Sequence, residues 1–243
     1  MFEAILFDMD GLFIDSEPDW HAAETEMMRG YGYDWQPADQ LQCLGGPLAR
    51  VTEYMSSCLN GSVKPETLAK VIIDEMQNRL SSTAAYMPGA IEFSKLVWQA
   101  QIPQALVSAS PRTLVDAVIS GLTHNYFKET VAAGDIARTK PFPDPYIHAA
   151  KLLGVDISKC LIFEDSQTGI TAATASGAFV VAIPHFIEVK ESERLKRIES
   201  FVGLLLQDLS KWWEINQREL GKEPKRSTNR ITCLAWGGIH FVR

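Results

Sequence analysis

The pattern of apolar and polar positions divides the chain into two kinds of segment. Residues 5–7 form an apolar run that ends in Asp8 and Asp10, just before Gly11. A short run that is apolar at every position is typical of a strand buried on both faces of a sheet. The following residues 16–86 show little strand character and carry apolar stripes at helical spacing. The first third of the chain therefore predicts one buried strand followed by a helical insertion.

Three helices are expected within this insertion. Pro18 stands near the start of the first, Pro47 precedes the second, and Pro65 opens the third. Proline is tolerated in the first turn of a helix, where its missing N–H costs no internal hydrogen bond. The third segment carries an apolar stripe that includes Leu68 and Ile72. We interpret such stripes as the core of a small helical domain.

From residue 87 onward, apolar strands alternate with helical segments. Strands are expected at 104–108, 130–133, 160–163 and 179–183, with helices over 111–121, up to 154 and up to 177. This alternation predicts an α/β fold with a doubly wound, Rossmann-like parallel sheet and an inserted α-helical cap. The expected parts are a core domain (1–15 and 87–220), a cap domain (16–86) and a basic C-terminal extension (221–243). The extension contains five basic residues and one acidic residue.

Composition and charge exclude several classes of protein. The net charge of −7 argues against a nucleic-acid-binding protein. No apolar stretch is long enough to cross a bilayer, and no basic segment followed by an apolar one opens the chain as a signal peptide would. The four cysteines (Cys43, Cys58, Cys160 and Cys233) form no CxxC pair, which favours free thiols. We therefore expect a monomer in the cytoplasm without nucleic-acid or membrane partners.

Polar groups stand at the ends of several predicted strands. Asp8 and Asp10 follow the first strand, Ser108 closes the second, Lys140 follows the third, and Glu164 and Asp165 follow the fourth. The carboxyl ends of parallel strands meet at one edge of the sheet, where open α/β sheets bind their ligands. Each group alone has an ordinary structural explanation, but together they supply the nucleophile, acid, hydroxyl and cation that phosphoryl transfer requires.

At these positions the chain resembles the haloacid dehalogenase superfamily of phosphotransferases. The four matching segments are Asp8-Met9-Asp10-Gly11, Val107-Ser108-Ala109-Ser110, Lys140-Pro141 and Phe163-Glu164-Asp165-Ser166, in the family's order. Further support comes from Asp15-Ser16-Glu17-Pro18, Pro88-Gly89 and Gly169-Ile170. Jointly these motifs are specific, although each alone is weak. The nearest look-alikes are sugar-phosphate phosphatases with a small helical cap, such as the 2-deoxyglucose-6-phosphate and hexitol-phosphate phosphatases, and β-phosphoglucomutase.

The resemblance implies a role for the polar residues at the carboxyl edge of the predicted sheet. Asp8 would attack phosphorus and form an aspartyl-phosphate, and Asp10 would act as general acid and base. Lys140 would offset negative charge and bind the phosphate together with the hydroxyl of Ser108 and the amide of Ala109.

The resemblance also implies a metal cofactor. Mg²⁺ would be held by Asp8, Asp165 and the backbone carbonyl of Asp10. Glu164 would be either a further ligand or a residue that supports the ligands, and we favour the supporting role. The implied activity is Mg²⁺-dependent hydrolysis of a small phosphorylated sugar or polyol.

Other functions on the same scaffold remain open. A halide-cleaving relative needs no second acid, so Asp10 favours phosphate chemistry. A β-phosphoglucomutase-like phosphotransferase is the nearest alternative, but those mutases carry a cap histidine where this chain has Trp20, with His21 one step out of register. A catalytically silent binding protein is the third possibility. For substrate contact in the cap, Trp20 and Arg50 are the candidates, and a surface ion pair is an equal alternative for Arg50.

Overall fold

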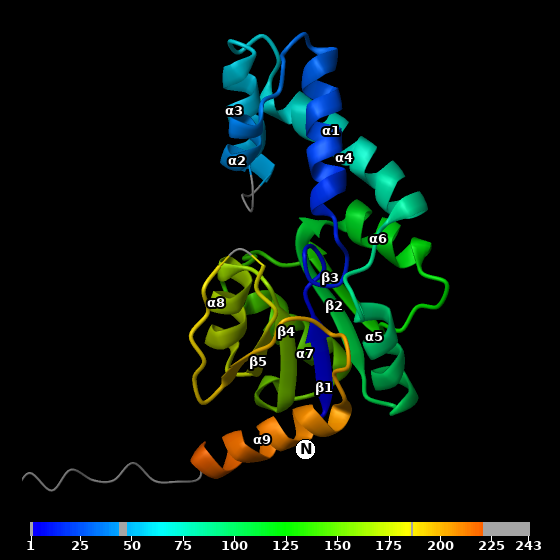
Figure 1. Ribbon diagram of the computed structural model, residues 1–243, viewed down its shortest axis with the longest axis vertical. Coiled ribbons are helices and arrows are strands. Elements are labelled where there is room, and N and C mark those ends of the chain that lie inside the picture. The colour runs from blue at the N-terminus through cyan, green and yellow to red at the C-terminus, as the bar shows by residue number, and fades with distance from the viewer. Residues whose placement is uncertain (1, 44–47, 186, 221–243) are drawn as a thin grey trace, which may run out of the picture.

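The computed structural model describes residues 2–43, 48–185 and 187–220 (Figure 1). Six strands are present in these ranges: β1 (Ala4–Phe7), β2 (Gln104–Pro111), β3 (Glu129–Ala133), β4 (Cys160–Glu164), β5 (Phe179–Ala182) and β6 (Leu195–Arg197). The helices are α1 (Glu17–Gly30), α2 (Pro37–Cys43), α3 (Leu48–Cys58), α4 (Pro65–Thr83), α5 (Ala90–Gln99), α6 (Arg112–Gly121), α7 (Asp144–Leu153), α8 (Gln167–Ser176) and α9 (Leu206–Leu220), with a short 3₁₀ turn at Ile157–Lys159.

The six strands form one parallel sheet in the order β3-β2-β1-β4-β5-β6. The chain winds in one direction from β1 to β3 and in the other from β4 to β6, so the order reverses between β1 and β4. Phe7, the last residue of β1, pairs with Leu106 on one side and with Phe163 on the other. The carboxyl ends of the three central strands therefore lie side by side at the point where ligands bind in open α/β sheets.

Both faces of the sheet are buried under helices, which confirms the predicted doubly wound α/β fold. Ile5 and Phe7 of β1 belong to an apolar cluster with side chains of α5, α6 and α9. Ala4 and Leu6, which point to the opposite face, belong to a second cluster with side chains of α7 and α8. Because every residue of β1 is buried, the strand reads as a continuous apolar run rather than as an alternation.

The segment between β1 and α5 contains the four helices α1 to α4. It extends beyond the carboxyl edge of the sheet (Figure 1). Helix α4 packs against both α1 and α3, and also against α6 of the sheet's helical layer. The buried face of α4 includes Leu68, Ile72 and Met76, as its apolar stripe predicts. Among the described residues, no helix combines the length and the apolar composition that crossing a membrane would require.

Some elements of the structure were not expected from the pattern of the sequence. Helices α2 and α5 and the short edge strand β6 are additional, and β2 continues three residues beyond Ser108. The segment 44–47, expected before the second helix of the insertion, and the basic extension 221–243 lie outside the described residues.

Candidate active site

The six strand-end residues expected to share an edge do so. Asp8 directly follows β1, and its backbone N–H donates to the carbonyl of Phe163 in β4 (3.0 Å). Glu164 is the last residue of β4, and Asp165 follows it. Lys140 stands between β3 and α7, and Ser108 lies within β2. The parallel register thus gathers side chains from four separate chain segments.

Lys140 is the cation at the centre of this group. Its side chain is 4% exposed, and its ammonium contacts a carboxylate oxygen of Asp8. The same ammonium donates to Oε1 of Glu164 (2.7 Å) and to the carbonyl oxygen of Val107 (3.0 Å). All three N–H donors of the ammonium therefore have acceptors. These interactions offset the free-energy cost of burying its positive charge.

Glu164 is held by a complete set of hydrogen bonds. Its Oε1 accepts from Lys140 and from the hydroxyl of the fully buried Tyr146 (2.6 Å). Its Oε2 accepts from the backbone N–H of Asp165 (3.0 Å) and of Ser166 (3.1 Å). The carboxylate fills the space beside Gly169, where an added Cβ would stand 1.7 Å from Oε1. With its oxygens engaged in this way, Glu164 fits the supporting role better than that of a direct metal ligand.

Asp165 differs from Glu164 in the hydrogen bonding of its carboxylate. Its Oδ1 is buried and has no hydrogen-bond partner among the described residues. One carboxylate oxygen each from Asp8, Glu164 and Asp165 lie within 4.8 Å of one another. Gly11 borders the same place, because a Cβ on it would stand 2.5 Å from Oδ2 of Asp165, and its φ of +77° suits glycine. An orphaned buried carboxylate oxygen in an all-oxygen cluster fits a hard divalent cation such as Mg²⁺.

The pKa shifts in the cluster reflect burial and an excess of negative charge. Burial, followed by the charge of Glu164, raises the pKa of Asp8 well above its ordinary range. The same two causes raise the pKa of Asp165 to about 8. Burial opposes the charge on Lys140, but the nearby carboxylates of Asp8 and Glu164 raise its pKa instead. One ammonium therefore does not balance the carboxylates around it, which again favours a cation at this place.

Asp10 stands beside the cluster and is held by three serine hydroxyls. Ser16 donates to its Oδ1 (2.9 Å), and Ser108 (3.1 Å) and Ser110 (2.8 Å) donate to its Oδ2. The hydroxyl oxygen of Ser108 also accepts the backbone N–H of Ser110 (2.9 Å). Ser108 thus contacts Asp10 directly, while Ala109 is the exposed residue of β2 next to it. The predicted phosphate contacts of Ser108 and Ala109 stay predictions.

The contacts described for the two residues expected to bind substrate from the cap are with other parts of the chain. Arg50 is exposed, and its guanidinium donates to the backbone carbonyl of Gln42 (2.7 Å). Trp20 is partly buried and packs against the main apolar cluster. A role in substrate binding remains a prediction for both residues.

Sequence reasoning assigned no role to three residues that the fold brings to the site. Tyr146 is fully buried, donates to Glu164 and places its ring 4.9 Å from the ammonium of Lys140. Ser16 and Ser110 orient Asp10. Ser16 and Ser110 belong to segments that match the family motifs, so the sequence already indicated that they lie near the site. A buried tyrosine hydroxyl requires a partner, but the sequence does not say which one.

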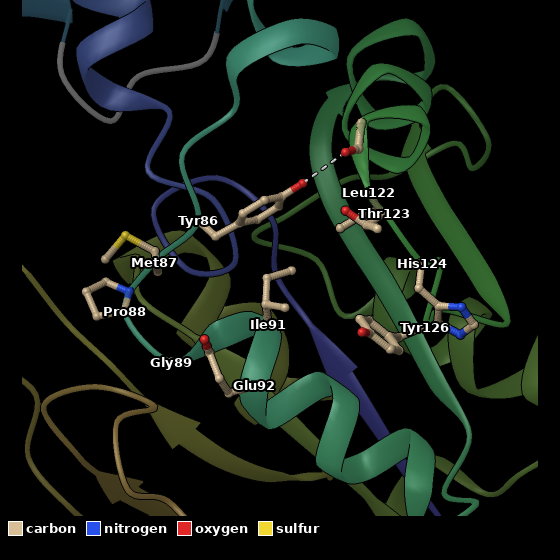
Figure 2. A pocket seen from close by; sticks show the side chains of 11 residues that line it. Tyr86, Met87, Pro88, Gly89, Ile91, Glu92, Leu122, Thr123, His124 and Tyr126 are labelled. Carbon is tan, nitrogen blue, oxygen red and sulfur yellow. Dashed lines mark hydrogen bonds between the residues drawn. The ribbon is translucent and has the colours of Figure 1, made fainter.

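A cavity of about 440 Å³ lies elsewhere, where the chain passes from α4 to α5 (Figure 2). Its walls come from residues in the stretches 86–92 and 121–126, and the hydroxyl of Tyr86 donates to the carbonyl of Gly121 across one end (3.4 Å). None of the clustered carboxylates lines it. The carboxylate cluster is therefore at the sheet edge and not in this cavity.

Comparison with known proteins agrees with the geometry of the site. The chain is 28% identical over 184 residues to fructose-1-phosphate phosphatase YqaB of Escherichia coli (strain K12), covering 75% of this chain and 96% of that protein. It is 31% identical over 185 residues to hexitol phosphatase B of the same strain, covering 74% and 83%. The crystal structure of CbbY from Rhodobacter sphaeroides in complex with phosphate has the same fold, with a TM-score of 0.72, 24% identity and coverage of 86% and 100%.

A family profile extends this similarity over most of the chain. The profile of the haloacid dehalogenase-like hydrolases matches residues 5–183, from the first strand to the residue after β5. The match spans Asp8, Lys140 and Asp165 together with the whole helical insertion. This chain belongs to the haloacid dehalogenase-like hydrolase family.

Proposed function

We propose that this protein is a Mg²⁺-dependent phosphatase that hydrolyses a small phosphorylated sugar or polyol through an aspartyl-phosphate intermediate. As a member of its family, the chain is a phosphoric monoester hydrolase. The observation that carries the mechanism is the contact of the Asp8 carboxylate with the buried ammonium of Lys140, next to Asp165. The substrate class is supported by the two relatives that are named as sugar-phosphate and hexitol phosphatases.

In the first displacement, an oxygen of Asp8 forms a bond to phosphorus while the bond from phosphorus to the alkoxide of the substrate breaks. Asp10 donates a proton to the leaving alkoxide. In the second displacement, Asp10 takes a proton from water, whose oxygen attacks phosphorus and releases Asp8. The three serine hydroxyls fix the carboxyl group of Asp10 for both proton transfers.

Lys140 stabilises the charge that develops at phosphorus. Its ammonium contacts Asp8, Glu164 and the carbonyl of Val107, so its positive charge stands beside the nucleophile before the phosphoryl group arrives. Ser108 and the amide of Ala109 stand at the same edge and would bind a phosphoryl oxygen.

Asp8, Asp165 and the backbone carbonyl of Asp10 would hold the Mg²⁺ ion, and Glu164 would support them. When bound, this ion supplies positive charge that neutralises the phosphoryl oxygens. The buried, unpartnered Oδ1 of Asp165 supports this assignment.

The domain division follows from the same proposal. We assign residues 16–86 to a cap over the site and residues 1–15 and 87–220 to the catalytic core. The helical character of α1 to α4 and their position beyond the sheet edge support this division. A monomer in the cytoplasm remains a prediction.

Hydrolysis of p-nitrophenyl phosphate and of a panel of sugar and polyol phosphates, with Mg²⁺ and with EDTA, tests the proposed function. We expect Mg²⁺-dependent release of phosphate that is lost in Asp8→Asn. If neither the wild type nor Asp8→Asn releases phosphate, a catalytically silent binding protein would be favoured.

A second assay separates hydrolysis from phosphoryl transfer. The enzyme is incubated with β-glucose 1-phosphate and a trace of the bisphosphate. Release of inorganic phosphate is expected. Accumulation of glucose 6-phosphate without free phosphate would instead establish the mutase.

A further inference from the structure

The chain folds back on itself directly after the proposed nucleophile. The backbone N–H of Ile14 donates to the carbonyl of Met9 (3.0 Å), and the N–H of Gly11 donates to the carbonyl of Ile14 (2.9 Å). Gly11 has a φ of +77°, a backbone conformation that glycine adopts without strain. This turn, residues 9–14, carries the side chain of Asp10 and its backbone carbonyl. The position of the turn therefore sets the geometry of the proposed general acid and of one proposed metal ligand.

A histidine from the loop after β5 contacts this turn. Nε2 of His185 lies 3.0 Å from the backbone carbonyl oxygen of Gly11. A carbonyl oxygen only accepts hydrogen bonds, so Nε2 carries the hydrogen and donates it. The start of the same loop is fixed to the sheet, because the N–H of Ile183 donates to the carbonyl of Glu164 at the end of β4 (2.8 Å). The chain segments that follow β1, β4 and β5 are thus linked to one another beside the proposed metal site.

Gly11 is confined on three sides. A Cβ on Gly11 would stand 2.5 Å from Oδ2 of Asp165, so its Cα lies directly against that carboxylate. The peptide group before Gly11 donates to Ile14, and the peptide group after it accepts from His185. Glycine has the widest choice of backbone angles of any residue, and these two hydrogen bonds restrict that choice. Because the peptide bond between Asp10 and Gly11 is planar, fixing Gly11 also fixes the direction of the Asp10 carbonyl.

The contact of His185 belongs to the site rather than to the core of the fold. The side chain is exposed, so core packing does not require an imidazole at this position. Holding an exposed side chain in one place costs conformational entropy. Its hydrogen bond joins two residues 174 positions apart in the sequence, and it ends on Gly11, which borders Asp165 of the carboxylate cluster. The effect of the contact therefore falls on the turn and on the oxygens that the turn presents.

We propose that His185 is a positioning residue for the metal site, which holds Gly11 so that the backbone carbonyl of Asp10 points to the Mg²⁺ ion. This inference rests on the proposed function and adds one residue to its machinery. His185 is not itself a ligand, because the nitrogen that faces the turn carries a hydrogen. Residues that orient metal ligands typically change metal affinity by about 10- to 100-fold when they are replaced. Since His185 acts through Gly11, the expected change is at the lower end of this range, about tenfold.

Calorimetric titration with Mg²⁺, without substrate, tests this role. His185→Phe keeps a ring and removes the N–H donor, and its Kd for Mg²⁺ should rise about tenfold. His185→Gln supplies an amide N–H in place of the ring N–H and should stay within about threefold of the wild type. His124→Phe alters another exposed histidine, one that lines the cavity and not the cluster. It is the matched control and should leave the Kd for Mg²⁺ unchanged.

Turnover and stability provide further readouts. The Mg²⁺ concentration for half-maximal hydrolysis of p-nitrophenyl phosphate should rise about tenfold in His185→Phe, while kcat at saturating Mg²⁺ stays within about threefold. The unfolding temperature in EDTA should be the same as in the wild type, because substitutions of exposed residues change stability little. If His185→Phe does not fold, His185→Ala takes its place with the same expected results.

Equal Mg²⁺ affinity in the wild type and His185→Phe would overturn this role, and so would an equal loss in His185→Phe and His185→Gln. Either result leaves the proposed function standing if the wild type releases phosphate. A wild type that binds Mg²⁺ but releases no phosphate from any substrate would refute the proposed function, while the titration would still decide the role of His185. A wild type that does not bind Mg²⁺ would refute both.

Discussion

The ammonium of Lys140 and Oε1 of Glu164 lie 2.7 Å apart, with their side chains 4% and 0% exposed. Removing the cation leaves both Glu164 and Asp8 as buried carboxylates without a counter-charge. We expect Lys140→Met to lower the free energy of unfolding by about 3–5 kcal/mol, measured by urea denaturation in EDTA. Lys159→Met, which breaks an exposed pair with Glu3, is the control and should change it little. Equal effects of the two substitutions would contradict the account.

Gly169 makes room for the carboxylate of Glu164. A Cβ at this position would overlap Oε1, and Glu164 is buried and held by hydrogen bonds from Lys140 and Tyr146, so its carboxylate cannot move away without losing them. We expect Gly169→Ala to cost about 1–3 kcal/mol of stability and to reduce phosphatase activity. Gly30→Ala, where an added Cβ meets nothing within 4 Å, should be neutral or slightly stabilising. Thermal unfolding and turnover of both variants decide this, and an active, stable Gly169→Ala protein would refute it.

The strand-end residues were predictable because the parallel sheet imposes their meeting. Asp8, Ser108, Lys140 and Asp165 each end or follow an apolar run, and the topology brings such ends together whatever the details of packing. The family motifs then supplied the roles. Helix α2 and strand β6 were missed because they are short and depend on tertiary contacts. Helix α5 is as long as α6 and buries Ala90, Phe93 and Val97 at helical spacing, so its pattern was open to prediction.

Contacts between residues far apart in the chain could not be predicted from the sequence. That Tyr146 would donate to Glu164, and that Asp10 would be shared by three serines, depends on side-chain packing between different elements. The unpartnered carboxylate oxygen of Glu24 could not be anticipated either, because an acidic residue in an amphipathic helix normally faces water.

The buried carboxyl of Asp165 predicts how pH affects stability. Burial and then Glu164 raise its pKa to about 8, whereas an unfolded aspartate titrates near pH 4. Between these values the folded chain holds a proton that the unfolded chain has released. The stability contributed by this group is therefore full below about pH 4 and is lost as the pH rises to about 8. In EDTA, the unfolding temperature should fall over this range.

Mg²⁺ should oppose that loss, because it binds the ionised carboxylates and releases their protons. The unfolding temperatures with Mg²⁺ and with EDTA should therefore diverge as the pH rises. Asp165→Asn should flatten the EDTA curve and remove most of the divergence. Coincident curves for the unaltered protein would show that no divalent cation binds at this cluster.

Asp10 is expected to matter most for poor leaving groups. An alkoxide needs a proton as it leaves, but p-nitrophenolate does not. Asp10→Asn should therefore reduce the rate of the first displacement by about 10²- to 10⁴-fold for sorbitol 6-phosphate and by much less for p-nitrophenyl phosphate. Single-turnover rates by rapid quench report this step. Equal losses on both substrates would exclude Asp10 as the general acid.

The most direct measurement is the detection of the covalent intermediate on Asp8. The enzyme is mixed with substrate and Mg²⁺, quenched in acid within milliseconds and reduced with borohydride, which converts an acyl phosphate into an alcohol. Mass spectrometry of the peptide that contains Asp8 should then show homoserine at this position, and none when substrate is omitted. Release of phosphate in the same turnover, with Asp8 unmodified at every quench time, would contradict the account.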